Sequence, residues 1–145
     1  MSNLGHLARR WVGSLSPRPP DPADAAWAES YLRPGELALW RQLSNADRRH
    51  AIDVARRFAG LGPWPHDEMA GALLHDIGKL DSGFGTTMRV VATLVGPRTA
   101  RLRRYHDHEA IGAAMLEAAG SSAATVELVE GRGPAAEALR RADDL

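Results

Sequence analysis

The stretch GALLHDIGKLD, which runs from Gly71 to Asp81, places a histidine and an aspartate side by side in an otherwise apolar segment. Burying an imidazole and a carboxylate costs free energy unless both groups find partners. Two kinds of partner would offset this cost: an ion pair within the protein, or a bound metal ion. The segment therefore predicts a polar site inside the fold, and the rest of the chain bears on which kind of site it is.

The overall composition narrows the possibilities. A length of 145 residues fits one domain, and 44% hydrophobic with 25% charged residues is typical of a globular protein. The 18 basic and 18 acidic side chains cancel, so we expect no specific binding to nucleic acid. The chain has no cysteine, so every metal ligand must be His, Asp or Glu. No run approaches the roughly 20 apolar residues of a membrane span, and we expect a cytoplasmic location.

Nearly every segment is typical of a helix, because Ala, Leu, Arg and Glu dominate and no run alternates apolar with polar residues. We predict an all-α, single-domain helical bundle in which residues 45–145 form the main domain and residues 1–44 a helical extension packed on it. Ser44 is the expected N-cap of one helix, with Asp47 three residues later. The expected helices are Leu4–Leu15, Pro22–Tyr31, Gly35–Leu43, Asn45–Gly60, His66–Leu80, Thr86–Val95, His108–Ala119, Ala123–Glu130 and Pro134–Asp144.

His-Asp pairs occur three times, and their surroundings separate them. His66-Asp67 begins a helix, where an acidic side chain suits the positive end of the helix dipole, so we interpret it as a solvated first turn. His106-Asp107 precedes another helix, where Asp107 is a good N-cap. His75-Asp76 differs, because its two residues continue the three- and four-residue spacing of the apolar positions before them. We therefore predict that both of its side chains lie late in a helix and point into the bundle.

Other polar residues also lie on apolar faces of predicted helices. His50 replaces an apolar residue on the core face of Asn45–Gly60, and His108 lies on the apolar face of its own helix. In the last helix, periodicity turns Asp143 inward and Asp144 toward solvent. Each of these, taken singly, is more often a hydrogen-bonded core residue than a ligand. Several of them on separate helices would meet in the bundle core, where helical proteins commonly bind metals.

The ordered set of His50, the pair His75-Asp76 and a late Asp143 resembles the H…HD…D pattern of the HD-domain metal-dependent phosphohydrolases. The wording HDIGK resembles the HDIG-type subset of that superfamily, which includes the HD-GYP phosphodiesterases. HEAIG, which begins at His108, is similar to the HxxxG element of the same subset. The resemblance covers roughly Asn45 to the C-terminus and implies an HD-type helical bundle for that region.

This resemblance implies that His50, His75, Asp76 and Asp143 bind one divalent cation, and the ligand set suits Mn, Fe, Co, Ni, Zn or Mg. Such an ion would activate a water molecule and polarise a phosphoryl group. Asp76 would also orient that water or take its proton, and Lys79 would stabilise charge on a phosphate oxygen. An alternative for Lys79 is a cation at the C-terminal end of a helix. The expected activity is hydrolysis of a small phosphomonoester or phosphodiester, nucleotides included.

The sequence departs from the HD-GYP pattern in two places. The region TVELVEGRGP has no histidine where that subset has an adjacent pair, and the GYP signature is missing. One cation per chain is therefore expected, and His108 is a candidate for a second metal ligand, a substrate contact or a core residue. The departures favour a second hypothesis, a catalytically inactive HD-fold binding or regulatory module that keeps the metal or only the scaffold. A third hypothesis is a structural helical domain in which His75-Asp76 belongs to an ion-pair network.

Overall fold

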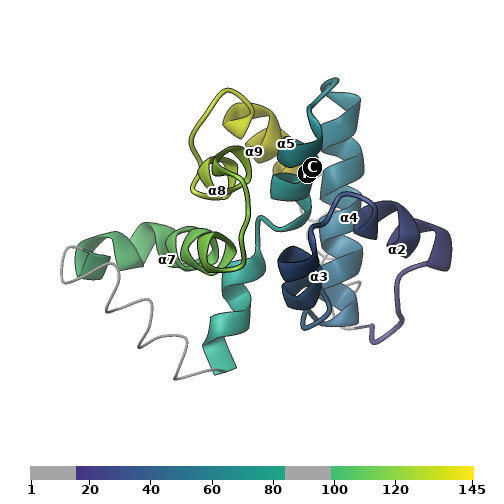
Figure 1. Cartoon of the computed structure of the whole chain (residues 1–145), viewed down its shortest axis with the longest axis horizontal. Helices are drawn as coiled ribbons and strands as arrows, with labels where there is room; N and C mark the ends of the chain where they lie inside the picture. The colour runs from purple at the N-terminus through teal and green to yellow at the C-terminus, as the bar shows by residue number, and fades with distance from the viewer. Residues whose placement is uncertain (1–15, 84–98) are drawn as a thin grey trace, which may run out of the picture.

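The computed structural model describes residues 16–83 and 99–145, and it describes side chains for residues 16–80 and 109–145. Within these ranges the chain forms seven α-helices and one 3-10 helix and contains no strand (Figure 1). The predicted all-α fold class is therefore confirmed. No helix in the described ranges has the length and apolarity needed to cross a membrane. The elements are α2 (Pro22–Glu29), α3 (Pro34–Trp40), α4 (Asn45–Gly60), α5 (His66–Leu73), η1 (Ile77–Gly83), α7 (Thr99–Ala118), α8 (Ala123–Val129) and α9 (Ala136–Asp144).

Helix α4 packs against α5, α9 and α2, and it has the bounds that the sequence predicts. It begins at Ser44, whose hydroxyl oxygen accepts a hydrogen bond from the Asp47 backbone N–H at 3.0 Å, which confirms the predicted N-cap. One face of α4 is apolar and packs against α5 and α9. The buried residues of that face are Ala51, Ile52, Val54, Ala55 and Phe58.

The buried core is continuous from the first described helices to the last. Ala28 of α2 and Trp40 of α3 belong to the same cluster of buried side chains as Phe58 of α4 and Leu139 of α9. The buried apolar side chains of these helices face one shared interior. A bundle of short helices removes apolar surface from water in this way. Residues 22–43 thus contribute side chains to the same core as the helices that follow them in the chain.

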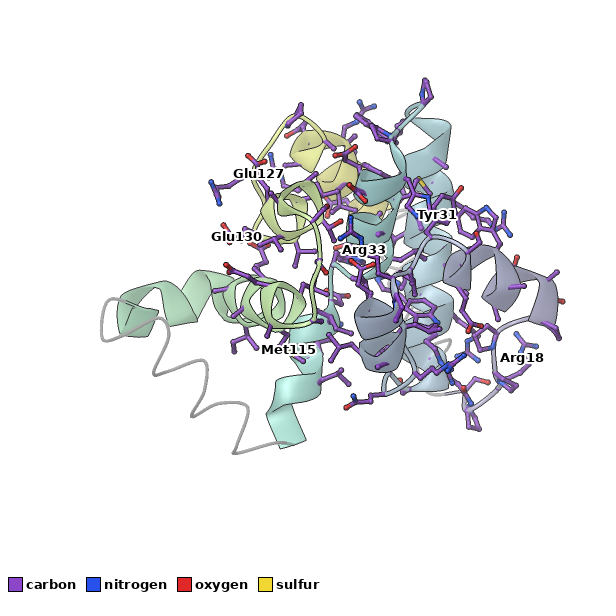
Figure 2. All side chains as sticks on the ribbon, viewed as in Figure 1. Arg18, Tyr31, Arg33, Met115, Glu127 and Glu130 are labelled. Carbon is purple, nitrogen blue, oxygen red and sulfur yellow. The ribbon has the colours of Figure 1, made fainter. Side chains whose placement is uncertain are left out.

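The start of α3 is fixed against the turn that follows α7. A Cβ atom at Gly35 would lie 2.1 Å from the backbone oxygen of Ala119, so only glycine allows this approach. Glu36 is 1% exposed and accepts hydrogen bonds from the Arg33 backbone N–H and from the Ser121 hydroxyl, at 2.8 and 2.6 Å. The side chain of Arg33, the residue before α3 that Figure 2 labels, donates a hydrogen bond to the Gly120 carbonyl oxygen at 3.1 Å. This corner ties the N-terminal helices to the rest of the fold.

The predicted helix His66–Leu80 is wrong in its second half. α5 ends at Leu73, a turn follows, and the chain continues as the 3-10 helix η1. Two hydrogen bonds between residues three apart mark the tighter winding, from Ile77 N–H to the Leu74 carbonyl and from Lys79 N–H to the Asp76 carbonyl, both at 3.0 Å. His75-Asp76 therefore lies in a turn between two helices and not late in one helix.

A close crossing of α7 over η1 accompanies this break. A Cβ atom at Gly112 of α7 would lie 3.1 Å from the backbone nitrogen of Gly78 and 3.1 Å from a methyl carbon of Ile77. The glycine of HDIGK and the glycine of HEAIG thus meet where the two elements cross. Because Gly112 has no side chain, the backbone of α7 can approach that of η1 closely. This contact lies where the chain changes from the α-helix α5 to the 3-10 helix η1.

Other boundaries differ by a few residues, with one larger difference. α7 begins at Thr99, so the predicted start at His108 is wrong; residues 99–107 are rich in helix formers and contain no proline or glycine to end the helix. The predicted helices Leu4–Leu15 and Thr86–Val95 lie outside the described residues. The remaining helices confirm their predicted positions to within three residues.

Candidate metal centre

The four residues predicted to be metal ligands come together from three elements. His50 is on α4, His75 and Asp76 form the turn between α5 and η1, and Asp143 is on α9. His50 Nε2 lies 3.1 Å and His75 Nε2 lies 3.5 Å from Asp143 Oδ1. Asp76 Oδ2 lies 3.3 Å from His75 Nε2 and 4.0 Å from His50 Nε2. The fold therefore brings both imidazoles and both carboxylates to one point.

These spacings suit a single cation. Nitrogen and oxygen ligands sit about 2.0–2.2 Å from a transition metal, so neighbouring ligand atoms around one ion are roughly 3–4 Å apart. One ligand atom each from His50, His75 and Asp143 lies within 4.8 Å of the other two. The closest distances to Asp76, given above, fall in the same range. The group of His50, His75 and Asp143 could therefore hold a metal ion, and Asp76 Oδ2 lies beside this group.

The turn after α5 explains why two consecutive residues reach the same point. In a continuous α-helix, neighbouring side chains point about 100° apart, so His75 and Asp76 would face different directions. Because α5 ends at Leu73, the backbone changes direction at these residues. The side chain of His75 is 9% exposed and that of Asp76 is 26% exposed; His75 Nε2 faces Asp143 Oδ1, and Asp76 Oδ2 faces His75 Nε2. The break in the helix is thus what builds this half of the cluster.

The hydrogen bonding of His75 presents a lone pair to the cluster. Its Nδ1 atom lies 2.7 Å from the Ala72 carbonyl oxygen, which can only accept, so Nδ1 carries a proton and donates it. The Nε2 atom is buried and has no hydrogen-bond partner of good geometry among the described residues. In the neutral ring this Nε2 lone pair faces Asp76 Oδ2 and Asp143 Oδ1, and either a proton on Nε2 or a bound cation would relieve the repulsion. Histidine metal ligands are commonly oriented in this way by a carbonyl.

The charges of the cluster also show in the pKa values. Burial acts to lower the pKa of His75, but the neighbouring carboxylates of Asp143 and Asp76 raise it to about 10. The hydrogen bond from His50 and the nearby His75 ring hold the pKa of Asp143 well below its usual range. Burial acts to raise the pKa of Asp76, but His75 and Lys79 lower it. In the absence of a metal, a proton on His75 thus balances part of the negative charge, and a divalent cation would displace it.

The cluster is open on one side. The exposed fraction of the side chains rises from 9% at His75 to 29% at His50 and 38% at Asp143. A cation held here would therefore keep positions for water or a ligand, as catalytic sites do and closed structural sites do not. Two imidazoles with two carboxylates suit the borderline divalent ions from Mn to Zn and do not select one of them.

Lys79 borders the cluster next to Asp76. Its ammonium group lies 3.2 Å from Asp76 Oδ2, and its side chain is 45% exposed. Lys79 is the third residue of η1, which continues to Gly83, so it does not lie in the last turn of a helix. The position leaves a positive charge beside the carboxylates, at the edge that a solvent-borne anion would reach.

Comparison of the chain with models of known protein families, with curated proteins and with solved structures found no match in any of the three. A functional proposal must therefore be based on the geometry and chemistry of the cluster.

The other predicted polar residues lie apart from the cluster or outside the described side chains. The His66 ring packs against Tyr31 at 5.2 Å between ring centroids, which fits a residue on a solvated first turn. Asp144 is exposed while Asp143 is half-buried, as the periodicity of α9 predicts. The side chains of His106, Asp107 and His108, the last a candidate second ligand or substrate contact, are not among those described. The backbone of all three lies within α7, so the predicted N-cap at Asp107 is wrong.

Two features of the centre were not predicted from the sequence. One is the Ala72 carbonyl that orients His75, and the other is Arg57, whose Nε–H donates to the Ala142 carbonyl at 2.7 Å. A backbone carbonyl gives no side-chain pattern, so nothing in the sequence marks the first. Arg57 follows His50 by seven residues, or two helical turns, and this spacing was the available signal that it faces α9 too.

Proposed function

We propose that the chain is a metal-dependent phosphohydrolase of the HD superfamily that hydrolyses a small phosphomonoester or phosphodiester, nucleotides included. The observation that supports it is the convergence of two imidazoles and two carboxylates from α4, the α5–η1 turn and α9, with neighbouring atoms 3.1–4.0 Å apart. A half-open cluster of this composition beside a lysine suits a cation that must also meet an anionic substrate.

The residues divide into ligands and groups that act on the substrate. His50, His75, Asp76 and Asp143 would hold the ion, which when bound supplies a Lewis acid for the phosphoryl group and lowers the pKa of water. Asp76 accepts hydrogen bonds as an ionised carboxylate. Because its pKa lies below the usual range, Asp76 is a weak base, and we assign it the orientation of the attacking water. Lys79 offers an ammonium group to a phosphate oxygen.

A binding or regulatory module is the second candidate. The region between α7 and α9 carries no histidine that would complete a second metal position. Such a module would bind an ion without turning over any phosphoester.

A structural ion-pair network is the third candidate. The observation that favours it is the raised pKa of His75, because an imidazolium between two carboxylates satisfies the charges without a metal. In that case neither ion binding nor turnover would be found.

One experiment separates these three functions. The purified protein is incubated separately with Mn, Fe, Co, Ni, Zn and Mg and assayed on p-nitrophenyl phosphate, bis-p-nitrophenyl phosphate and nucleoside monophosphates. We expect turnover with at least one metal, loss of turnover and of the ion in Asp76→Ala, and retention of both in Asp144→Ala. Asp144 is the matched control because it is an exposed carboxylate next to a ligand. Bound ion without turnover would favour the regulatory module, and neither would favour the ion-pair network.

A further inference from the structure

Asp143 occupies a position that its own helix cannot hold firmly. It is the penultimate residue of α9, which has nine residues and is too short to be stable by itself. The last carbonyl groups of a helix have no donor within the helix, so its last turn tends to fray. Asp144 and Leu145, which follow, are both exposed. A contact from outside α9 must therefore fix the carboxylate in the cluster.

Arg57 of α4 provides such a contact. Its Nε–H donates to the carbonyl oxygen of Ala142 at 2.7 Å, and the Ala142 side chain is fully buried. The residue before Asp143 is thus held by both its backbone and its side chain. The guanidinium charge also meets the negative end of the α9 dipole.

Two residues of α4 contact the end of α9, and only one of them, His50, is a predicted metal ligand. His50 contacts the Asp143 side chain, and Arg57 contacts the backbone one residue earlier. The two residues are seven apart, which places them on one face of α4 about 10 Å apart along the helix. We infer that Arg57 is a positioning residue that holds Asp143 in the metal centre. This inference rests on the proposed function, because it concerns the affinity of that same site for a cation.

Arg56 offers a matched control on the same helix. It points away from α9, forms an ion pair with Asp24 at 2.6 Å, and lies over the Trp27 ring at 4.2 Å from the centroid. Substituting either arginine removes one positive charge from α4 together with that side chain's contacts to a neighbouring helix. Only Arg57 contacts α9 next to a candidate ligand.

The test is a titration with Co²⁺ alone, followed by its visible absorption, on the wild type and on Arg57→Ala, Arg57→Lys, Arg56→Ala and Asp143→Ala. Arg57→Ala is expected to bind Co²⁺ about 10- to 100-fold more weakly, the usual effect of losing an outer partner of a ligand. Its absorption band should be weaker than that of the wild type at the same Co²⁺ concentration, and Asp143→Ala should show no such band. Arg57→Lys should recover part of the affinity, because lysine can still donate to the carbonyl. Arg56→Ala should bind like the wild type.

The outcomes separate the inference from the function on which it rests. A folded Arg57→Ala protein that binds Co²⁺ as tightly as the wild type overturns the positioning role, whatever its melting temperature. If Arg57→Ala does not fold, the same comparison is made with Arg57→Met, which keeps most of the aliphatic chain but has no donor; an affinity equal to that of the wild type overturns the role and a weaker one supports it. A wild type that binds no Co²⁺ overturns the metal function and the inference together.

Discussion

The Nε2 atom of His50 lies 3.1 Å from Oδ1 of Asp143, although 93 residues separate them in the sequence. The contact joins α4 to α9, so the candidate centre forms only when these two helices pack together. A site assembled in this way does not exist in the unfolded chain. Binding of a cation to it is therefore coupled to folding.

Added metal should stabilise the fold. At a free metal concentration 100 times the Kd, binding to the folded state alone raises the free energy of unfolding by about 2.7 kcal/mol. We expect the melting temperature of wild type and Asp144→Ala to rise with Mn²⁺, Co²⁺ or Zn²⁺ and to fall back with EDTA, whereas that of Asp143→Ala should not respond. Differential scanning fluorimetry checks this, and a wild type whose melting temperature ignores every metal would contradict it.

The metal-free protein should lose stability as the pH rises. The pKa of His75 is raised from 6.5 to about 10, so the folded state binds a proton that the unfolded state releases. The stabilisation is fully present below pH 6.5 and is lost as the pH approaches 10. The lowered pKa values of Asp76 and Asp143 add a contribution that is present above 3.8 and is lost in stronger acid. Melts in EDTA across this range check the sign, and His75→Gln should flatten the alkaline loss.

Metal affinity should depend on pH with the opposite sign. A cation competes with the proton on His75, so the apparent Kd for Co²⁺ should fall as the pH rises from about 6 to about 8. Titrations at several pH values, within the range where Co²⁺ stays soluble, measure this. An affinity that does not change with pH would mean that His75 is not a ligand.

Substitution of Lys79 should separate turnover from metal binding. Lys79→Met keeps most of the aliphatic chain and removes the charge beside Asp76. If the ammonium group meets a phosphate oxygen, kcat should fall about 100-fold, as for loss of one preorganised donor. Lys79→Arg should retain more activity, and the metal content of both variants should match the wild type. Unchanged turnover in Lys79→Met would leave Lys79 with a structural role only.

Two glycine substitutions should change stability in opposite directions. Gly35→Ala forces a methyl group against the Ala119 carbonyl oxygen, and the overpacking should cost about 1–3 kcal/mol. Gly60→Ala meets nothing within 4 Å at the end of α4 and should gain up to about 1 kcal/mol from helix propensity. Urea unfolding of the two variants and the wild type measures both changes. A Gly35→Ala protein as stable as the wild type would contradict the close approach of α3 to residue 119.

Features that depend on neighbouring residues could be predicted from the sequence. The bounds of α4 and the cap at Ser44 follow from local signals, namely a hydroxyl before a run with helical spacing. The same spacing separates the half-buried Asp143 from the exposed Asp144. The four candidate ligands could be selected because each breaks an apolar pattern or matches a known motif.

Features that depend on packing between distant segments could not be predicted. Leu74, His75 and Asp76 are all compatible with a longer helix, and what accompanies its end is the crossing of Gly112 over Gly78. His75 and Arg57 each donate a hydrogen bond to a backbone carbonyl. Every residue has a backbone carbonyl, so the residue types in the sequence do not reveal these contacts. The sequence therefore pointed to the members of the centre but not to the contacts that orient them.

The cation content of the purified protein tests the central claim most directly. Elemental analysis is made on the wild type, Asp143→Ala and Asp144→Ala, before and after incubation with Mn²⁺, Co²⁺, Ni²⁺ or Zn²⁺ and removal of the excess. The arrangement of His50, His75, Asp76 and Asp143 predicts one ion per chain in the wild type and in Asp144→Ala, and loss of the ion in Asp143→Ala. A wild type that retains no ion under any of these conditions, or an Asp143→Ala protein that retains it fully, would contradict the metal centre.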